Sequence, residues 1–309
     1  MTALSHHVGR DPALPDPTAP LTATGNLRRR VAVSRLISIL ATASAVFAVA
    51  LLFNVAYTVI QKGAPAISFS FLTQNSSGLA GGGIANALLG TIVLVAFGAL
   101  IALPIGVLTG LYLTEFASPT SRFGNALKLV LDLLQGLPTI IVGVVVYGLL
   151  VASQHLETGF AGGIALAIVM LPMIARSSQE VLLLVPNSMR EAADALGVER
   201  WRTVTGIILP AAAGGIATGA ILSIARAAGE TAPLLLVDSI YNPTQTQLNL
   251  FGHGVPSIPM FIYTTYDLPT TSALTRAWGA ALVLLTAILA ANVGARFLLA
   301  RSRAKMGAR

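Results

Sequence analysis

Long runs of apolar residues alternate with shorter polar segments along most of the chain. A helix that crosses a bilayer needs about 20 mostly apolar residues, and six runs meet this length. The predicted spans cover residues 36–60, 86–113, 127–151, 160–184, 207–237 and 273–298. The fourth and fifth runs are long, so we expect their ends nearest the cytoplasm to leave the bilayer. The pattern predicts an all-α membrane protein with six transmembrane helices.

The remaining segments divide the chain into four parts. Residues 1–27 are rich in Pro, Thr, Ala and His and predict a disordered cytoplasmic tail. Residues 28–82 hold the first transmembrane helix and an outer loop, residues 83–298 the main transmembrane domain, and residues 299–309 a basic cytoplasmic tail. The first apolar run has no convincing small-residue cleavage site, which favours a retained anchor over a cleaved signal peptide.

The composition indicates where the apolar faces lie. Of 309 residues, 55% are hydrophobic and only 10% charged, and the mean hydropathy is +0.79. Soluble domains carry roughly 25% charged residues, so we expect lipid to cover much of this surface. The net charge of +7 comes without a nucleic-acid-binding motif, which argues against a nucleic-acid partner. The chain has no cysteine, and its four histidines show no metal-ligand spacing, so we predict no metal site.

The positions of lysine and arginine predict the orientation, because cytoplasmic loops carry the excess of these residues. Placing both termini inside puts 15 of the 19 on the cytoplasmic side. These are Arg10, Arg28, Arg29, Arg30, Arg35, Arg122, Lys128, Arg190, Arg200, Arg202, Arg296, Arg301, Arg303, Lys305 and Arg309. Only Lys62 and Arg276 fall outside, and Arg176 and Arg226 lie within spans. We therefore predict a multi-pass protein of the plasma (inner) membrane with both termini in the cytoplasm.

Three glycine pairs have the spacing GxxxG, which lets helix backbones approach closely. They are Gly106/Gly110, Gly159/Gly163 and Gly215/Gly219. Packing within this chain is the simpler interpretation, and contact with a second subunit is the alternative.

The cytoplasmic segment between spans four and five predicts a short helix with sharp ends. Ser188 followed by Glu191 fits a capping box, in which each side chain satisfies a backbone donor at the helix start. Ala192 and Ala193 favour helix and make a small, smooth face. Gly197 can take the left-handed conformation that ends a helix. From these residues alone, the segment is an amphipathic helix of about two turns on the membrane surface.

Spans four and five each carry a pair of ionisable residues, which are costly in a membrane and are therefore functional candidates. Arg226 and Glu230 are four residues apart in span five, as are Arg176 and Glu180 in span four. A buried ion pair that only fixes packing and an anion pathway past Arg226 both fit this spacing. In the pathway interpretation the guanidinium binds the anion, Thr231 adds a hydroxyl donor, and Glu230 keeps the binding weak enough for release.

Two further charged positions have simpler interpretations. Arg176 is a pathway candidate, but it also fits a place near the cytoplasmic edge, from which its charge extends toward water. Lys128 and Asp132 form another pair four residues apart, and we expect them on a solvated face at the start of span three.

The cytoplasmic segment resembles the "EAA" loop of ABC importer permeases. Glu191-Ala192-Ala193, Gly197, Ile207 and Leu209-Pro210 match the spacing EAA-x3-G-x9-I-x-L-P at every named position. The resemblance implies a type I importer permease with MetI-like architecture, whose coupling helix docks in a groove of an ATPase subunit. Glu191 and Gly197 would shape that helix, and Ala192 and Ala193 would let it seat, with Ser188 at its start.

The outer segment Phe251–Tyr266, which contains Pro256 and Pro259, fits the PstA side of the PstA/PstC phosphate permeases better than the PstC side. Four further segments resemble both sides of this pair. They are Arg226–Pro233 (R-x-x-G-E-T-A-P), Leu171–Glu180 (LP-x-x-AR-x-x-x-E), Gly136–Gly143 and Gly110–Phe116 (G-x-Y-L-x-E-[YF]). The resemblance implies a pathway for inorganic phosphate that includes Arg226, Glu230, Thr231 and Arg176. It also implies a PstC-like second permease, two PstB-like ATPase subunits and a PstS-like extracytoplasmic phosphate-binding protein on the side of the long loop 238–272.

The chain lacks the G-x-x-x-x-G-K-[ST] loop that cradles nucleotide phosphates. We therefore expect no enzymatic activity and no cofactor in this chain, with ATP and Mg²⁺ bound by the partner ATPase. Two alternatives stay open: the same machine carrying sulfate, molybdate or a sugar, and an ion-driven carrier or channel. An intramembrane enzyme finds no support, because HExxH and GxSxG motifs are missing.

Overall fold

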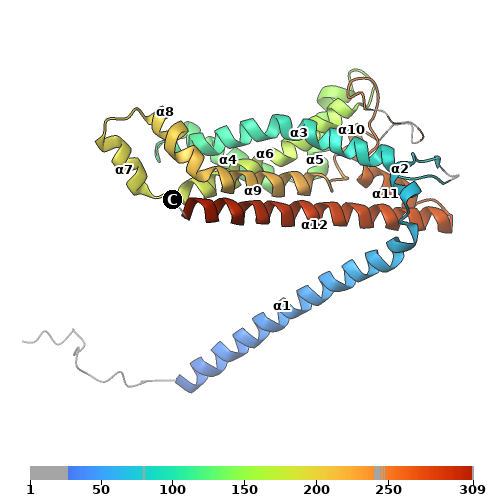
Figure 1. Ribbon diagram of the computed structural model, residues 1–309, viewed down its shortest axis with the longest axis horizontal. Coiled ribbons are helices and arrows are strands. Elements are labelled where there is room, and N and C mark those ends of the chain that lie inside the picture. The colour runs from blue at the N-terminus through green and yellow to red at the C-terminus, as the bar shows by residue number, and fades with distance from the viewer. Residues whose placement is uncertain (1–26, 79–80, 240–243, 245, 247, 308–309) are drawn as a thin grey trace, which may run out of the picture. The chain divides into compact units, whose positions relative to one another are not determined.

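The computed structural model describes residues 27–78, 81–239, 244, 246 and 248–307 (Figure 1). The predicted tail 1–27 lies outside the described residues except for Leu27. The chain divides into two compact units, residues 1–56 and residues 57–309, and each is described by itself. Within the described ranges the regular structure is helical, with one isolated antiparallel bridge between Ser76 and Gly82.

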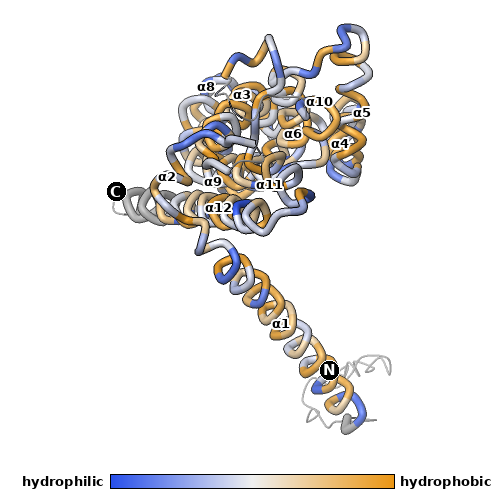
Figure 2. Tube along the Cα trace, turned by 90° about the vertical axis from the view of Figure 1, so that its right-hand side faces the viewer, coloured by the Kyte–Doolittle hydropathy of each residue, from blue (hydrophilic) through white to orange (hydrophobic). Residues whose placement is uncertain are grey.

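The first unit contains most of α1 (Leu27–Gly63), which includes the predicted first span. Apolar residues follow one another along this helix, and its first turn carries arginines (Figure 2). The helix satisfies its own backbone hydrogen bonds, which is what a segment in lipid requires.

The second unit is a bundle of helices with shorter elements at its two ends. Its helices are α2 (Phe69–Thr73), α3 (Ala85–Leu111), α4 (Arg122–Gly136), α5 (Thr139–Val146), α6 (Gly159–Leu183), α7 (Asn187–Ala195), α8 (Arg200–Thr203), α9 (Leu209–Ala227), α10 (Leu234–Val237), α11 (Ile258–Tyr266) and α12 (Thr271–Gly307). Three π-helical turns, Tyr112–Phe116, Tyr147–Val151 and Val204–Ile208, extend α3 and α5 and lead into α9.

The long helices α3, α6, α9 and α12 run side by side, with α6 packed against both α3 and α9 (Figure 1). Helices α7 and α8 lie at one end of this bundle, here named the α7 end. Helices α2, α10 and α11 lie at the opposite end, here named the α11 end (Figure 1). The C-terminal part of α12 reaches the α7 end and continues through Gly307, into the segment predicted as a tail.

The described helices include five that are long and apolar enough to cross a membrane, and a bent pair supplies a sixth candidate. That pair corrects the third predicted span, because α4 and α5 meet at 105° instead of forming one helix. Leu137 is extended between them, with ψ 136°, since a residue before proline avoids helical geometry. The fifth span is also corrected: its helical stretch begins at Arg200 and ends at Ala227, not at residue 237.

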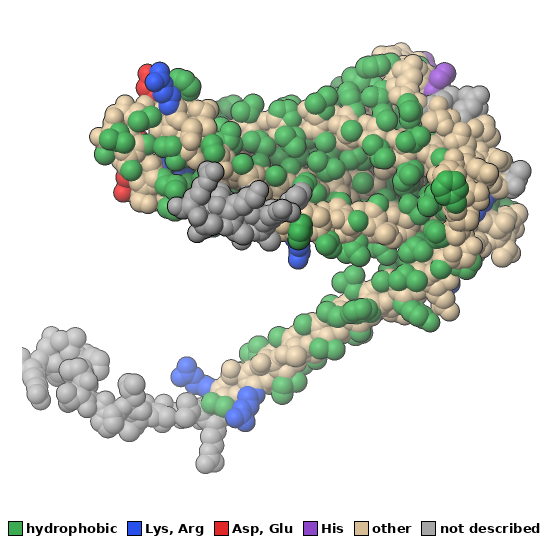
Figure 3. Space-filling view, in the orientation of Figure 1, with side chains coloured by type: hydrophobic (Ala, Val, Ile, Leu, Met, Phe, Trp, Pro, Cys, Tyr) green, Lys and Arg blue, Asp and Glu red, His purple; other side chains and the backbone are tan. Residues whose placement is uncertain are grey.

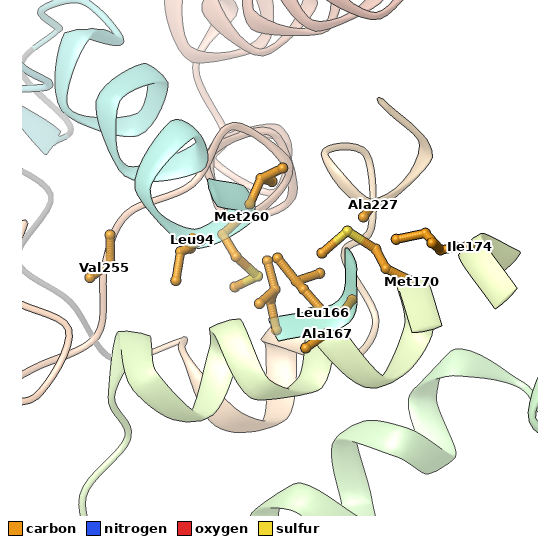
Figure 4. Packing of buried hydrophobic residues seen from close by; sticks show 11 residues of the cluster. Leu94, Leu166, Ala167, Met170, Ile174, Ala227, Val255 and Met260 are labelled. Carbon is orange, nitrogen blue, oxygen red and sulfur yellow. The ribbon is translucent and has the colours of Figure 1, made fainter. Parts of the chain in front are cut away.

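The core lies where α3, α6 and α11 meet (Figure 4). Leu94, Leu166, Met170, Val255 and Met260 are buried there together. The segment around Val255 belongs to the long loop after α10, so that loop folds against the bundle as its length suggested.

The glycine pairs pack within this chain. A Cβ added to Gly110 would lie 2.7 Å from the carbonyl oxygen of Ala175 on α6, and one on Gly106 would crowd the same helix. A Cβ on Gly215 of α9 would lie 2.5 Å from Val181 Cγ1, also on α6. The other three glycines of these pairs, Gly159, Gly163 and Gly219, meet this chain's side chains as closely. The intramolecular interpretation of the spacing is confirmed.

Large apolar side chains also cover the flank of the bundle (Figure 3). Ile92, Leu100 and Leu108 on α3 are exposed by 58%, 73% and 62%. A contiguous surface of this kind would make a water-soluble protein aggregate, whereas lipid solvates it. Charged side chains gather at the α7 end (Figure 3).

Candidate functional site

The segment between α6 and α9 contains the predicted short helix. Helix α7 spans nine residues, and Gly197 follows it with φ +67°. The Gly197 N–H donates to Asp194 O at 3.0 Å, and the Val198 N–H donates to Ala193 O at 3.1 Å. This pair of bonds is the Schellman motif, which requires a left-handed residue at the position of Gly197. The predicted length and C-terminal end are confirmed.

The predicted capping box at Ser188 is wrong. Helix α7 begins at Asn187, with Pro186 as its N-cap and no side-chain cap hydrogen bond. The carbonyl of Pro186 accepts a bond from the Met189 N–H at 3.2 Å. Proline presets φ near the helical value, so the backbone of Pro186 starts the helix and Ser188 lies inside the first turn.

The α7 helix presents mostly exposed residues. Glu191 and Ala192 are exposed, whereas Ala193 is buried, so the predicted alanine face is divided between surface and interior. Met189, Leu196 and Trp201 are 43%, 82% and 57% exposed. The short helices at the α7 end therefore expose large apolar side chains as well as charged ones.

Two arginines of this loop converge on one buried carboxylate. Glu115 lies in the π-helical turn that ends α3, and 1% of its side chain is exposed. Arg190 of α7 donates from Nη2 to Oε1 of Glu115 at 2.8 Å, and from Nε to both oxygens at 3.2 and 3.4 Å. Arg200 of α8 donates from Nε to the Glu115 carbonyl at 2.8 Å and lies 3.6 Å from Oε2. The carboxylate therefore joins α3 to both short helices of the loop.

Arg190 also binds the end of α6. Its Nη2 donates to the Leu182 carbonyl at 3.0 Å, and its Nη1 donates to the Val185 carbonyl at 2.7 Å and to Asn187 Oδ1 at 3.2 Å. Carbonyls in the last turn of a helix have no partner within the helix, so the guanidinium satisfies them while it pairs with Glu115.

Arg226 and Glu230 do not form the predicted pair. Helix α9 ends at Ala227, and the chain then tightens, with Gly229 N–H bonded to Arg226 O and Glu230 N–H bonded to Ala227 O. These bonds reach back three residues, so Glu230 leaves the helix face that carries Arg226. Within the part of the chain that the structure describes, no ion pair involves Arg226.

Arg226 instead lines a cavity of about 330 Å³ between α4, α5, α6 and α9. The lining residues are Leu134, Gln135, Leu137, Thr139, Val142, Val169, Pro172, Met173 and Arg226. Two helix irregularities meet here, the bend between α4 and α5 and the proline inside α6. Gln135 Nε2 donates to the Pro172 carbonyl at 3.4 Å. In membranes, broken helices of this kind are found where the backbone lines a cavity.

Thr231 lies at a different cavity from Arg226. That cavity has a volume of about 400 Å³ and is lined by Thr231, Pro259, Ile262, Tyr263, Tyr266 and Asp267. It lies between the α9–α10 connection and α11. Arg226 and Thr231, which belong to one sequence motif, therefore line two separate cavities.

Arg176 pairs with Asp132 of α4, not with Glu180. It also donates to Gln179 Oε1 at 2.9 Å and to the Lys128 carbonyl at 3.2 Å. Asp132 therefore pairs with Arg176 and not with Lys128, its predicted partner. Arg176 thus joins α6 to α4, and it is not among the residues that line the Arg226 cavity.

The α11 end contains a buried acid that the sequence did not single out. Asp238 follows α10, and its Oδ1 accepts from the Val255 N–H at 2.7 Å, while its Oδ2 has no hydrogen-bond partner among the described residues. Burial raises the pKa of the Asp238 carboxyl well above its ordinary value, the Val255 bond lowers it, and the charge of Glu157 raises it further. Glu157 itself accepts from the Ser239 N–H at 2.6 Å. These contacts attach the loop after α10 to the start of α6.

Comparison with protein families gives one match. The family described as "Binding-protein-dependent transport system inner membrane component" matches residues 102–305. The "Phosphate transport system permease protein PstA" of Haemophilus influenzae is 38% identical over 241 residues, which cover 78% of this chain and 84% of that protein. "PstA 1" of Mycobacterium tuberculosis is 38% identical over 226 residues, covering 72% and 73%.

Solved structures show the same fold at low identity. A chain of a bacterial alginate ABC transporter matches with a TM-score of 0.60 at 16% identity, and the match covers 89% of this chain and 99% of that chain. The MetNI methionine ABC transporter gives a TM-score of 0.53 at 20% identity, covering 71% and 93%.

Proposed function

The chain belongs to the family of binding-protein-dependent transport system inner membrane components, and on that premise we propose that it carries inorganic phosphate inward as one of two permease subunits. The family is an inner membrane component of ABC importers, so this multi-pass protein is a transport subunit. The relatives named as phosphate permeases support phosphate as the cargo.

The observation that carries the choice of cargo is Arg226 in its cavity. A guanidinium offers a planar fork of donors that matches phosphate oxygens, and its charge persists at any relevant pH. Gln135 and Thr139 line the same cavity and supply neutral hydrogen-bonding groups. The anion in this proposal binds beside one fixed positive charge at the junction of two broken helices.

The Thr231 cavity provides a second station toward the α11 end. Thr231 and Tyr263 offer hydroxyl groups, and Asp267 adds a negative charge that opposes tight anion binding. Along the chain, Glu230 lies between Arg226, which lines the first cavity, and Thr231, which lines the second. Arg176 acts indirectly, because its contact with Asp132 holds α4, which contributes Gln135 to the Arg226 cavity.

The α7 helix is the proposed contact with separate ATPase subunits, which bind ATP and Mg²⁺. The excess of Lys and Arg in the loops at this end supports a cytoplasmic α7 end and an N-in, C-in orientation. A PstC-like permease completes the pathway, two PstB-like ATPases contact the α7 end, and a PstS-like phosphate-binding protein delivers the anion at the α11 end.

Reconstitution of the complete complex with its binding protein tests this proposal. Arg226→Lys should leave assembly intact and lower uptake at limiting phosphate by at least about tenfold, because hydrogen bonds to charged groups contribute roughly 1.5–3 kcal/mol. The matched control is Arg296→Lys, an exposed arginine on α12 that lines neither cavity.

Three results would contradict the proposal. Unchanged uptake in Arg226→Lys would remove the role of that side chain. ATPase stimulation by sulfate, molybdate or a sugar, with none by phosphate, would replace the cargo. Uptake driven by an ion gradient without ATPase subunits would replace the energy source.

A further inference from the structure

Helix α7 is attached to the rest of the bundle by few side chains. Seven of its nine residues are exposed, and Arg190 and Ala193 are the two that are covered. The chain also changes direction at both ends of α7. Pro186 is extended before the helix, and Gly197 is left-handed after it. A helix held in this way can turn about its joints unless a firm side-chain contact fixes it.

The contact between Arg190 and Glu115 is the firm one. The Glu115 side chain is 1% exposed and that of Arg190 is 18% exposed, so water screens their attraction little. A buried carboxylate left without its partner is strongly unfavourable. Arg200 adds a second guanidinium to the same residue. The loop therefore binds Glu115 from two helices at once.

Glu115 in turn belongs to a rigid pair of spanning helices. Gly110, five residues earlier on α3, packs directly on the α6 backbone at Ala175. Helix α6 carries Pro172, which lines the Arg226 cavity and accepts the bond from Gln135. Close packing of this kind moves as a body, because packed cores do not deform continuously.

We propose that Glu115 is a positioning residue that makes α3 follow the movement of α7, so that ATP-driven motion reaches the Arg226 cavity. The inference rests on the proposed function, since α7 must be the part that the ATPase moves. Arg190 would still bind the α6 carbonyls at Leu182 and Val185 without Glu115. Glu115→Gln therefore leaves α7 next to α6 but removes the charged contact that fixes the orientation of α7 relative to the α3–α6 pair.

The first test measures coupling in proteoliposomes that contain both permeases, the ATPase subunits and the binding protein. Glu115→Gln should retain the ATPase through purification and keep hydrolysing ATP, but transport at least about fivefold less phosphate per ATP, within the roughly 5- to 150-fold range of coupling between sites. Glu115→Asp keeps the charge and should restore part of that ratio. Glu180→Gln, an exposed carboxylate on α6, should match the wild type.

A double-mutant cycle separates the link from general loss of stability. If Glu115 and Arg190 act as one connection, Glu115→Gln with Arg190→Gln should lower the ratio no further than the worse single variant. Independent, multiplying losses would overturn the inference. A wild-type ratio of phosphate transported per ATP hydrolysed in Glu115→Gln would also overturn the inference. So would loss of part of the ATPase during purification if the complexes that keep it show the wild-type ratio.

A second measurement needs no cargo and distinguishes this inference from the proposed function. The chain has no cysteine, so Leu137→Cys places a single thiol at the Arg226 cavity. Its rate of maleimide modification should change between the nucleotide-free and vanadate-trapped complexes, and Glu115→Gln should abolish that change. A change retained in Glu115→Gln overturns the inference, whereas a wild-type complex that shows the change but takes up no phosphate refutes the proposed cargo alone.

Discussion

Replacing Gly197 by alanine isolates the contribution of one backbone conformation to ATPase binding. Gly197 has φ +67°, and no atom of the described residues lies within 4 Å of the position that a Cβ would take. The substitution therefore introduces no clash, and its cost is that of a left-handed L-residue, about 1–2 kcal/mol. The substitution therefore weakens the two Schellman hydrogen bonds that end α7.

Under the proposed function this cost lowers the affinity for the ATPase, because the ATPase would bind α7 in its folded form. A loss of one or two kcal/mol changes a conformational equilibrium by a factor of about 5–30. At the upper part of this range the intact end of α7 becomes a minor population, and the apparent affinity falls with that population. We expect Gly197→Ala to raise the dissociation constant of the purified ATPase for the immobilised permease pair by up to this factor.

Gly206 provides the matched control. It lies nine residues further along the same loop, in a π-helical turn, and a Cβ there also meets no atom within 4 Å, but its φ is not positive. Gly206→Ala should leave the dissociation constant unchanged, and Gly197→Asn should lie between alanine and glycine, because asparagine tolerates the left-handed region. Equal losses at both glycines, or no loss at Gly197, would refute the conformational argument.

Two further predictions concern stability in detergent, measured by thermal denaturation. Burial raises the pKa of Asp238, so its contribution to stability is full below the ordinary carboxyl pKa and is lost as pH rises through the raised pKa of the folded state. Asp238→Asn should therefore gain in Tm relative to the wild type as pH rises above the ordinary carboxyl pKa, and a pH-independent difference would contradict this. Gly110→Ala should lower the Tm, because its Cβ would lie 2.7 Å from Ala175 O and overpacking costs roughly 1–3 kcal/mol, whereas Gly136→Ala, which has open space, should not.

Features that depend on neighbouring residues could be predicted from the sequence. The extent of α7 and the left-handed Gly197 follow from alanine, glycine and proline within one short segment. Helix α6 also matches its predicted span within one residue at each end, because its apolar run is continuous. The start of α7 was assigned to Ser188, since a capping box and a proline N-cap are both compatible with this segment.

Hydropathy could not reveal where the apolar helices change direction. Apolar residues lie on both sides of Leu137-Pro138 within 127–151, so a hydropathy average over this stretch does not locate the 105° bend. Span five was extended past Ala227 for the same reason, since Leu234, Leu235 and Leu236 continue the apolar run. Helix breaks depend on local backbone preference, which a sliding average removes.

Contacts between distant segments were also beyond the reach of spacing. Arg190 and Glu115 are separated by 75 residues, and Arg176 and Asp132 by 44. Helical spacing favours Glu180 as the partner of Arg176, and it indicates no distant partner for Arg190. The one available signal was Glu115 itself, an acidic residue at the very end of a long apolar run, because such a residue needs a partner.

The early end of α9 matters for the chemistry of Arg226. An arginine paired with Glu230 on the same helix face would offer an incoming anion a charge already neutralised by a tethered carboxylate. Because the helix stops at Ala227, Arg226 sits in its last turn, where the helix dipole favours a cation, and Glu230 has left that face. The positive charge is thus stabilised by backbone carbonyls, which attract it more weakly than a full negative charge does. In the proposed pathway, an anion in the cavity would bind the guanidinium without displacing a carboxylate, which suits a site that must fill and empty in every transport cycle.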